Sequence, residues 1–456
     1  MIKVRLLAET NVPPIELTKH AAMTCYRSVT PELAKIIAGE YQKVPEFEEL
    51  FENGHHTTLE HTSFTFEIDG ISVGDVDFGL HLTSPFYNSD QRSGRYAKMF
   101  EDPNAVDGVI DAILEVYPDL ETSSVDAIRN YVGYCLSVYH DNQDLATKVC
   151  GQLHEQERPH LTEDLRKKMP KLAQEQLRAF IPIIVPTGLD YTIDLITLAG
   201  SYHSAWSPGT RKLTELMVAE VLAVHPELEL MFGERQGTLG DFAPKFVTRG
   251  TKLIGGPKLT LVSIEAPLGV KVPTRRDKHP LDLTTIHPGF MDNEVGTYLA
   301  KVECTLMTYG QDQRHRSNRR SQPVLTGNFL LSPMLTKLGL GAEAKHVMRL
   351  LRALEGLVPD SLLVVLAPYG ATIRYMKRGS LNALIHESGK RLCFCAQGEI
   401  YELMRQLRLQ LEAKPKWGAF LPLVEPPCMN GPCAEPGRYC GRDMTRKDDY
   451  FPPRSV

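Results

Sequence analysis

The chain has 456 residues, of which 42% are hydrophobic and 23% are charged. These proportions are typical of soluble globular proteins and exclude a disordered chain, a collagen-like fibre and a charge-run linker protein. The length is enough for two or more domains. The formal net charge of −5 is not the basic footprint of a nucleic-acid-binding protein, so we expect no nucleic-acid partner.

Cysteine usage indicates a reducing compartment, because an odd number of cysteines is scattered along a long chain. The first ten residues are too polar for a signal peptide. No run approaches the ~20 apolar residues of a membrane helix. We therefore expect a cytoplasmic protein with no membrane partner. The nine cysteines are Cys25, Cys135, Cys150, Cys304, Cys393, Cys395, Cys428, Cys433 and Cys440.

In chain order, the first half predicts a mixture of strands and helices. Residues 3–9 form an apolar-rich first strand, and the alternation over 64–70 predicts a second strand. Apolar residues at helical spacing predict several helices between 107 and 178. A long amphipathic helix follows around 213–222.

The second half follows a glycine-rich segment that lacks helical or strand periodicity. Residues 258–265 predict another first strand, and 302–309 predict an apolar strand. The stripe over 400–411 predicts a second long amphipathic helix. The tail after Pro426 is rich in Pro, Gly and Cys, so we expect a loop there.

The two halves open with similar strands and close with helices that contain Glu-Leu-Met, at 215–217 and 402–404. This repetition favours a duplicated domain over coincidence. We predict an α+β protein of two tandem copies, the first with extra helices. The expected divisions are a first copy at 1–240, a linker at 241–257, and a second copy with a Cys-rich tail at 258–456.

Two clusters offer metal ligands by composition. In the first, His56 and His61 with Glu60 could bind zinc, but His-x4-His does not place both imidazoles on one helix face. A polar turn is the favoured interpretation. The cysteines after 392 are spaced C-x-C, C-x4-C and C-x6-C, which is not a standard pair of zinc knuckles. We expect no metal.

Two further clusters suit anions. Ser93-Gly94-Arg95 combines a hydroxyl donor, an accessible backbone and a guanidinium fork, which together fit phosphate oxygens. A solvated loop is the alternative. Residues 311–320 hold five Arg or His in ten positions, a density that should face a polyanion. An exposed basic loop is the alternative there.

Together these clusters resemble the flavin-dependent thymidylate synthases, whose signature runs Arg-His-Arg-x-x-Ser-x-Asn-Glu-x-Ser-x-Arg-Tyr. The first half carries the family's upstream His-x-Ser/Thr-x-x-Glu-His motif and the back of the signature. Residues 83–85 stand where Arg-His-Arg is expected. The matching residues are His55, Thr57, Glu60, His61, Gln91 (in place of Glu), Ser93, Gly94, Arg95 and Tyr96.

The second half carries the parts that the first half lacks. Gln311-x-x-Arg314-His315-Arg316 resembles the family's Gln-x-x-Arg-His-Arg. Arg391-x4-Ala-Gln-Gly398-Glu resembles Arg-x4-Ala-Gln-Trp-Glu, with Gly398 in place of Trp. Two more second-half residues, Arg378 and Asn382, are spaced like the family's flavin contacts. In the first half, Arg178 precedes Ile-Pro as an Arg precedes Leu-Pro in the family.

The resemblance implies two copies of the family's fold, a mixed sheet flanked by helices. It also implies the conversion of dUMP to dTMP, with methylenetetrahydrofolate as carbon donor and NADPH as reductant through FAD. Arg391 is the catalytic candidate, because a guanidinium at the uracil edge stabilises negative charge that develops in the reaction. The implied dUMP ligands are Gln91, Ser93, Gly94, Arg95, Arg178, Gln311, Arg314 and Arg391. The implied FAD ligands are His55, Thr57, Arg314, His315, Arg316, Arg378 and Asn382.

Family members are homotetramers whose sites are shared between subunits, so the resemblance implies a homodimer of this chain acting as a pseudo-tetramer. The composite site could form within or between chains. Two alternatives stay open: a non-catalytic paralogue that binds nucleotide or flavin, and a related uridylate C5-alkylating enzyme with another product. Gln91 and Gly398 differ from the family's Glu and Trp at these positions, and these differences favour the two alternatives.

Overall fold

The computed structural model describes most of the chain. The described residues are 1–81, 86–92, 105–235, 244–246, 252–265, 294–418, 420–429, 432–433, 435–442 and 451–456. Within these residues, no helix combines the length and the apolar character needed to cross a bilayer.

The first half is built on a four-stranded antiparallel sheet, the first sheet. Phe64, Phe66 and Ile68 alternate toward the core on its central strand and are almost fully buried, as the period of two in a strand requires. The sheet order is β1 (Lys3–Glu9), β2 (Ser63–Ser72), β4 (Pro186–Asp194), β3 (Tyr87–Gln91).

The second half forms a larger sheet, the second sheet, in which both parallel and antiparallel pairs occur. The predicted α+β class with a mixed sheet flanked by helices is therefore confirmed. The sheet order is β5 (Lys245–Phe246), β10 (Val324–Leu330), β11 (Ala371–Ser380), β8 (Thr297–Thr305), β7 (Lys258–Glu265), with β6 (Leu253–Ile254) beside β10 and β9 (Arg319–Arg320) beside β11.

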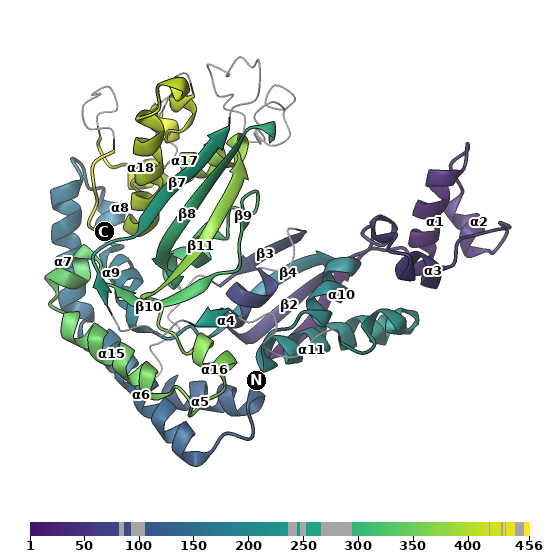
Figure 1. Cartoon of the computed structure of the whole chain (residues 1–456), viewed down its shortest axis with the longest axis horizontal. Helices are drawn as coiled ribbons and strands as arrows, with labels where there is room; N and C mark the ends of the chain where they lie inside the picture. Colours follow the sequence, from purple (N-terminus) through teal and green to yellow (C-terminus); the bar gives the residue numbers. More distant parts are fainter. Residues whose placement is uncertain are drawn as a thin grey trace.

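Each sheet is followed by a pair of helices (Figure 1). The first sheet has α10 (Leu195–His203) and α11 (Pro208–Val224), and the second has α17 (Leu381–Arg391) and α18 (Gly398–Glu412). The remaining helices of the first half are α1 (Pro14–Tyr26), α2 (Leu33–Ile37), α3 (Phe47–Glu52), α4 (Val73–Asp75), α5 (Ala105–Val116), α6 (Thr122–Asp141), α7 (Gln143–Glu157), α8 (Glu163–Arg166) and α9 (Met169–Leu177). Those of the second half are α13 (Leu306–Asp312), α14 (Pro333–Lys337), α15 (Gly341–Ala353) and α16 (Asp360–Val365).

The two sheets share their local details. β1 pairs with β2 as β7 pairs with β8, and each pair has a register break at the fifth residue of its outer strand, Leu7 or Val262. Such a bulge re-aims an edge strand. The central strands also end alike, because a side chain caps the following helix. The caps are Ser72 and Thr305 after β2 and β8, and Asp194 and Ser380 after β4 and β11.

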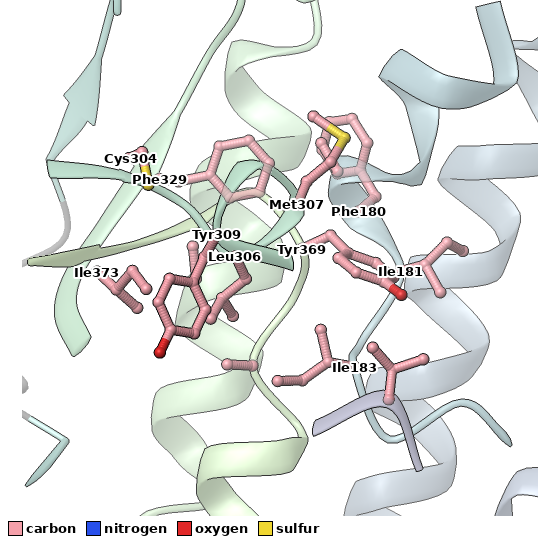
Figure 2. Close-up of a cluster of buried hydrophobic side chains, with 14 of the residues drawn as sticks. Phe180, Ile181, Ile183, Cys304, Leu306, Met307, Tyr309, Phe329, Tyr369 and Ile373 are labelled. Atoms are coloured by element: carbon pink, nitrogen blue, oxygen red, sulfur yellow. The ribbon is translucent and has the colours of Figure 1, made fainter. Parts of the chain in front are cut away.

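The halves meet through a common hydrophobic core. Pro182 and Pro368 form an antiparallel bridge, with Ile183 N–H donating to Ala367 O at 2.9 Å. Figure 2 shows Phe180 and Ile183 of the first half among core side chains of the second half, such as Met307. Because this core is continuous, burial of apolar area holds the halves together.

Two segments differ from the sequence-based expectation. The apolar run 302–309 is a strand only to Thr305, whose hydroxyl accepts the Thr308 N–H and starts α13. In addition, the expected linker 241–257 contains β5 and β6, which extend the second sheet.

Candidate functional site

The basic loop of the second half lies against β3 of the first half. The Arg314 guanidinium donates from Nη1 to Ser89 O at 3.3 Å and from Nη2 to Gln91 Oε1 at 3.4 Å. Arg316 Nη1 donates to Tyr87 O at 2.8 Å. One chain therefore brings together the two incomplete signatures, since β3 leads directly into Ser93-Gly94-Arg95. Those three residues, all expected dUMP ligands, lie outside the described residues.

Arg391, at the end of α17, joins this cluster. Its Nε donates to His315 Nε2 at 2.9 Å, and its Nη2 donates to Gln311 O at 3.0 Å. Gln311 in turn donates from its side-chain amide to Gln397 Oε1. The structure thus places the expected catalytic residue beside two other predicted site residues.

His315 is held neutral and in one tautomer. Burial, together with the charges of Arg391 and Lys377, holds the pKa of His315 well below its ordinary value. Because Nε2 accepts from Arg391, the ring proton is on Nδ1. That Nδ1–H has no hydrogen-bond partner among the described residues, although the residue is only 6% exposed. A buried donor of this kind is costly unless a ligand satisfies it.

A buried network of charged side chains contacts the loop that carries Arg314, His315 and Arg316. Arg320 Nε lies 2.6 Å from Asp312 Oδ2, and Lys377 Nζ lies 2.5 Å from both Asp312 Oδ1 and Glu387 Oε1. Burial alone would raise the pKa of Asp312, but Arg320 and Lys377 bring it well below its usual range. Arg320 also donates to His315 O at 3.3 Å. The network therefore fixes the backbone of the Arg-His-Arg loop.

Arg178, an expected dUMP ligand, is a buried cation of the first half. It begins a short 3-10 turn (Arg178–Phe180), is 7% exposed, and stands 5.2 Å from the ring centroid of Tyr369. Its Nε has no hydrogen-bond partner in the described part of the chain. A desolvated guanidinium with free donor capacity is suited to bind an anion.

Asp77 and His81 are buried ionisable residues that the motif comparison missed. Burial raises the pKa of Asp77 to about 7, although Arg314 and Arg178 act in the opposite direction. Burial, with Arg314 and Arg316, lowers the pKa of His81 to about 3, so this ring is neutral beside Ser89 Oγ at 3.0 Å. Perturbed pKa values of this kind are typical of functional sites. No sequence pattern signals them, because the burial and the nearby arginines depend on residues far apart in the sequence.

The expected flavin residues do not all come together. His55 and Thr57 are exposed beside a 3-10 turn (His56–Thr58) that packs on α1 and α3. In Figure 1 the first sheet lies between these helices and β11, which carries the exposed Arg378. Asn382 is fully buried in α17 and donates to Glu294 Oε1 at 2.5 Å.

Comparison with known proteins finds similarity to one family. Residues 5–227 match the model of the thymidylate synthase complementing proteins. A flavin-dependent thymidylate synthase of Clostridium tetani (strain Massachusetts / E88) is 27% identical over 236 residues, which is 50% of this chain and 85% of that protein. Just under half of the chain is therefore similar to this family. The matched region runs from β1 into the turn after α11, so it lies within the first half.

Two solved structures show a weaker likeness. Thymidylate synthase X of Helicobacter pylori, solved with FAD and dUMP, is 19% identical, with a TM-score of 0.32 over 51% of this chain and 100% of its own. The UMP/dUMP methylase PolB of Streptomyces cacaoi, solved with 5-Br dUMP, is 13% identical, with a TM-score of 0.31 over 51% of this chain and 94% of its own.

Proposed function

We propose that this protein is a flavin-dependent thymidylate synthase that converts dUMP to dTMP. Methylenetetrahydrofolate supplies the carbon, and NADPH supplies the reducing equivalents through FAD. The observation that carries the proposal is the contact of Arg314 with Gln91 and Ser89. It joins the front of the family signature, in the second half, to its back, in the first half.

The two halves are proposed to be tandem copies that have lost complementary parts. The shared pairing, bulges and caps support a common origin. Counting from the paired prolines, Arg178 corresponds to Val364, so only the first half keeps this cation. Ser72 and Thr305 cap equivalent helices, and counting from them places His81 of the first half at the position of Arg314. Residues 195–207, which follow the cap Asp194, contain no arginine that could be equivalent to Arg391. Each chain therefore has a single copy of each of these three arginines, Arg178, Arg314 and Arg391.

The nucleotide would lie between the halves. Its phosphate would bind Arg178 and Ser93-Gly94-Arg95, since guanidinium and backbone N–H groups match phosphate oxygens. Gln91, Gln311 and Arg314 would complete the site, in line with the family's pattern. Gln311 Oε1 and Gln397 Nε2 have no partner among the described residues, which leaves an acceptor and a donor for a base.

Arg391 would act on the uracil edge. C5 of uracil is a poor nucleophile, and negative charge develops on the O2–N3–O4 edge as C5 attacks. A fixed guanidinium stabilises that charge most strongly where water is excluded. The contact with His315 orients the guanidinium before substrate arrives.

The residues fit a flavin only if two chains cooperate. FAD, when bound, carries hydride chemistry that no side chain supplies. The unpartnered His315 Nδ1–H, with Arg314 and Arg316, provides donors for it. His55 and Thr57 stand apart from Arg378 and Asn382 in one chain. We therefore propose a cytoplasmic homodimer, equivalent to a four-copy assembly, in which His55 and Thr57 come from the second chain.

A second candidate is a paralogue that binds the ligands without turnover, or that alkylates another uridylate. Gln91 in place of a carboxylate and Gly398 in place of an indole favour it. Mass identification of the product from FAD, NADPH, methylenetetrahydrofolate and either dUMP or UMP separates these cases. We expect dTMP from dUMP. Flavin binding without product would favour the paralogue, and a product from UMP alone would favour the other uridylate.

A further inference from the structure

Five of the nine cysteines surround one cavity of about 450 Å³. The cavity lies between the loop that follows α17 and the tail beyond Pro426. Two other wall residues, Arg438 and Arg442, are cationic. The five cysteines are Cys393, Cys395, Cys428, Cys433 and Cys440.

These cysteines differ from those of the hydrophobic core. Cys135, Cys150 and Cys304 are fully buried among apolar side chains, where cysteine acts as a small hydrophobe. The five are instead half-buried around open volume, and no disulfide joins any of the nine. Packing alone does not account for five thiols facing one cavity, since a core would fill that space.

Two of the five sulfur atoms accept backbone hydrogen bonds, whereas Cys395 Sγ donates to Arg438 O at 3.7 Å. Cys395 N–H donates to Cys393 Sγ at 3.4 Å, and Glu435 N–H donates to Cys433 Sγ at 3.3 Å. Backbone N–H donors to sulfur are a feature of metal–thiolate centres, whose properties they tune.

Cations surround the thiols. The Arg442 guanidinium lies 4.2 Å from the ring centroid of Phe394, which separates Cys393 from Cys395. Arg158, which does not line the cavity, is 6% exposed and donates to Phe394 O. Positive charge favours the thiolate form, which is the form that binds metals. Several thiolates close together still repel one another unless a metal cation joins them.

We propose that this cavity holds a thiolate-ligated metal centre. Zinc binds four thiolates at ~2.3 Å in a tetrahedron, which brings the sulfur atoms within about 4 Å of one another. Within the described residues, no three ligand side chains already stand close enough for a single ion. An iron–sulfur cluster is also held by four cysteine thiolates. Its several iron and sulfide atoms fill more space than one zinc ion, so a cavity of about 450 Å³ suits a cluster better than zinc.

The centre would connect the tail to the proposed active site. Cys393 lies two residues after Arg391, and the same loop ends at Gln397. Ligation of Cys393 and of tail cysteines such as Cys440 would therefore hold this loop in place. The inference concerns metal binding, so it does not depend on the proposed reaction.

The test is metal content of the full chain purified without oxygen. We expect either iron with acid-labile sulfide and visible absorption, or one zinc per chain. Iron with sulfide identifies a cluster, and zinc identifies a single-ion site. Cys393→Ser and Cys440→Ser should each lose most of the metal. Cys25→Ser, on the exposed end of α1, is the matched control and should keep it.

Two results would overturn the proposal. One is protein that stays metal-free even after incubation with Zn²⁺, or with Fe²⁺ and sulfide. The other is metal retained equally in Cys393→Ser, Cys440→Ser and Cys25→Ser, which indicates adventitious binding. Circular dichroism shows whether the variants fold. If they do not, the metal content of the unaltered chain and the loss of thermal stability on chelation still decide the question.

Discussion

Arg391 has two of its nitrogen atoms committed within the protein, on His315 and on the Gln311 carbonyl. This arrangement costs no reorganisation during a reaction, which is the condition under which a charge stabilises a transition state most. The role assigned to Arg391 is therefore electrostatic rather than structural.

Replacement of Arg391 by Ala should leave flavin bound but reduce turnover. Loss of one such donor often costs roughly 2.7–4 kcal/mol of barrier, or about 10²–10³ in kcat. Steady-state kinetics and flavin absorbance check both parts. Arg374→Ala is a matched control, because Arg374 is on β11 and forms only a surface ion pair with Glu303 at 3.0 Å. Near-normal kcat in Arg391→Ala would rule out the role.

Asp77 gives a prediction about pH. Its pKa is near 7 in the fold and about 3.9 in an unfolded chain. The folded state therefore holds a proton that the unfolded state has lost, and stability falls as pH rises from about 4 to 7. Asp77→Asn removes this pH-dependent loss of folding stability, which amounts to about 1.4 kcal/mol per unit of pKa difference at most.

The difference in Tm between Asp77→Asn and the unaltered protein should therefore become more positive from pH 5 to pH 8. Thermal unfolding followed by circular dichroism at each pH measures it. A difference that is constant with pH, or that shrinks as pH rises, would show that Asp77 is ionised in the fold.

At the scale of elements, the start of α18 depends on a distant segment. A Cβ at Gly398 would lie 2.8 Å from the Val456 carbonyl carbon and 2.9 Å from its oxygen. Segment 451–456 is fixed there by Arg454, which donates to Ala396 O at 2.7 Å, and by Tyr401 OH, which donates to Pro452 O at 2.9 Å. The glycine in place of the family's Trp thus leaves room for this segment.

Gly398→Ala should displace segment 451–456 and destabilise the fold by roughly 1–3 kcal/mol, as overpacking does. Limited proteolysis should also cut the tail sooner. Gly200→Ala, in α10, has nothing within 4 Å of the added Cβ and should be neutral or stabilising. Equal Tm values for the two variants would mean that the segment does not pack on Gly398.

Sequence patterns predicted some elements and missed others for physical reasons. The alternation at 64–70 identifies β2, because one face of that strand is buried. The run 302–309 was harder, since Leu306, Met307 and Tyr309 are buried as a helix and an apolar run does not distinguish a buried strand from a buried helix. β5 and β6 are two residues each and owe their conformation to pairing with β10.

Sequence patterns likewise predicted some features of the candidate site and missed others. Motifs predicted Arg314, His315 and Arg391 as site residues, and the structure brings Arg391 and His315 into contact. The motifs could not show that Asp77 is buried beside two arginines, or that five cysteines face one cavity. Both facts depend on contacts between residues that are far apart in the sequence.

At the scale of the whole molecule, the residues proposed for the two ligands are arranged differently. Of the residues proposed for the nucleotide, Gln91 on β3 and Arg314 are in contact within one chain. Those proposed for FAD are divided between the region of His55 and the region of Arg378. Dimerisation would therefore complete the flavin site and leave the nucleotide site unchanged.

Mixing variants tests this division. His55→Ala and Arg378→Ala should each weaken FAD binding, and mixed dimers should recover a site that has both residues intact. Flavin fluorescence after exchange of subunits measures the recovery, and a titration should saturate at one FAD per chain. Saturation at two per chain, an active monomer, or no recovery on mixing would count against the shared flavin site.

The most direct test of the central claim, that each nucleotide site uses both halves of one chain, is turnover of a mixture of Arg178→Ala and Arg391→Ala. Either variant alone should be inactive, because neither half has a spare copy of the lost residue. After subunit exchange the mixture should remain inactive, since every chain has one damaged residue in its own site. Restored formation of dTMP would contradict the claim and show that Arg178 and Arg391 of different chains form the site.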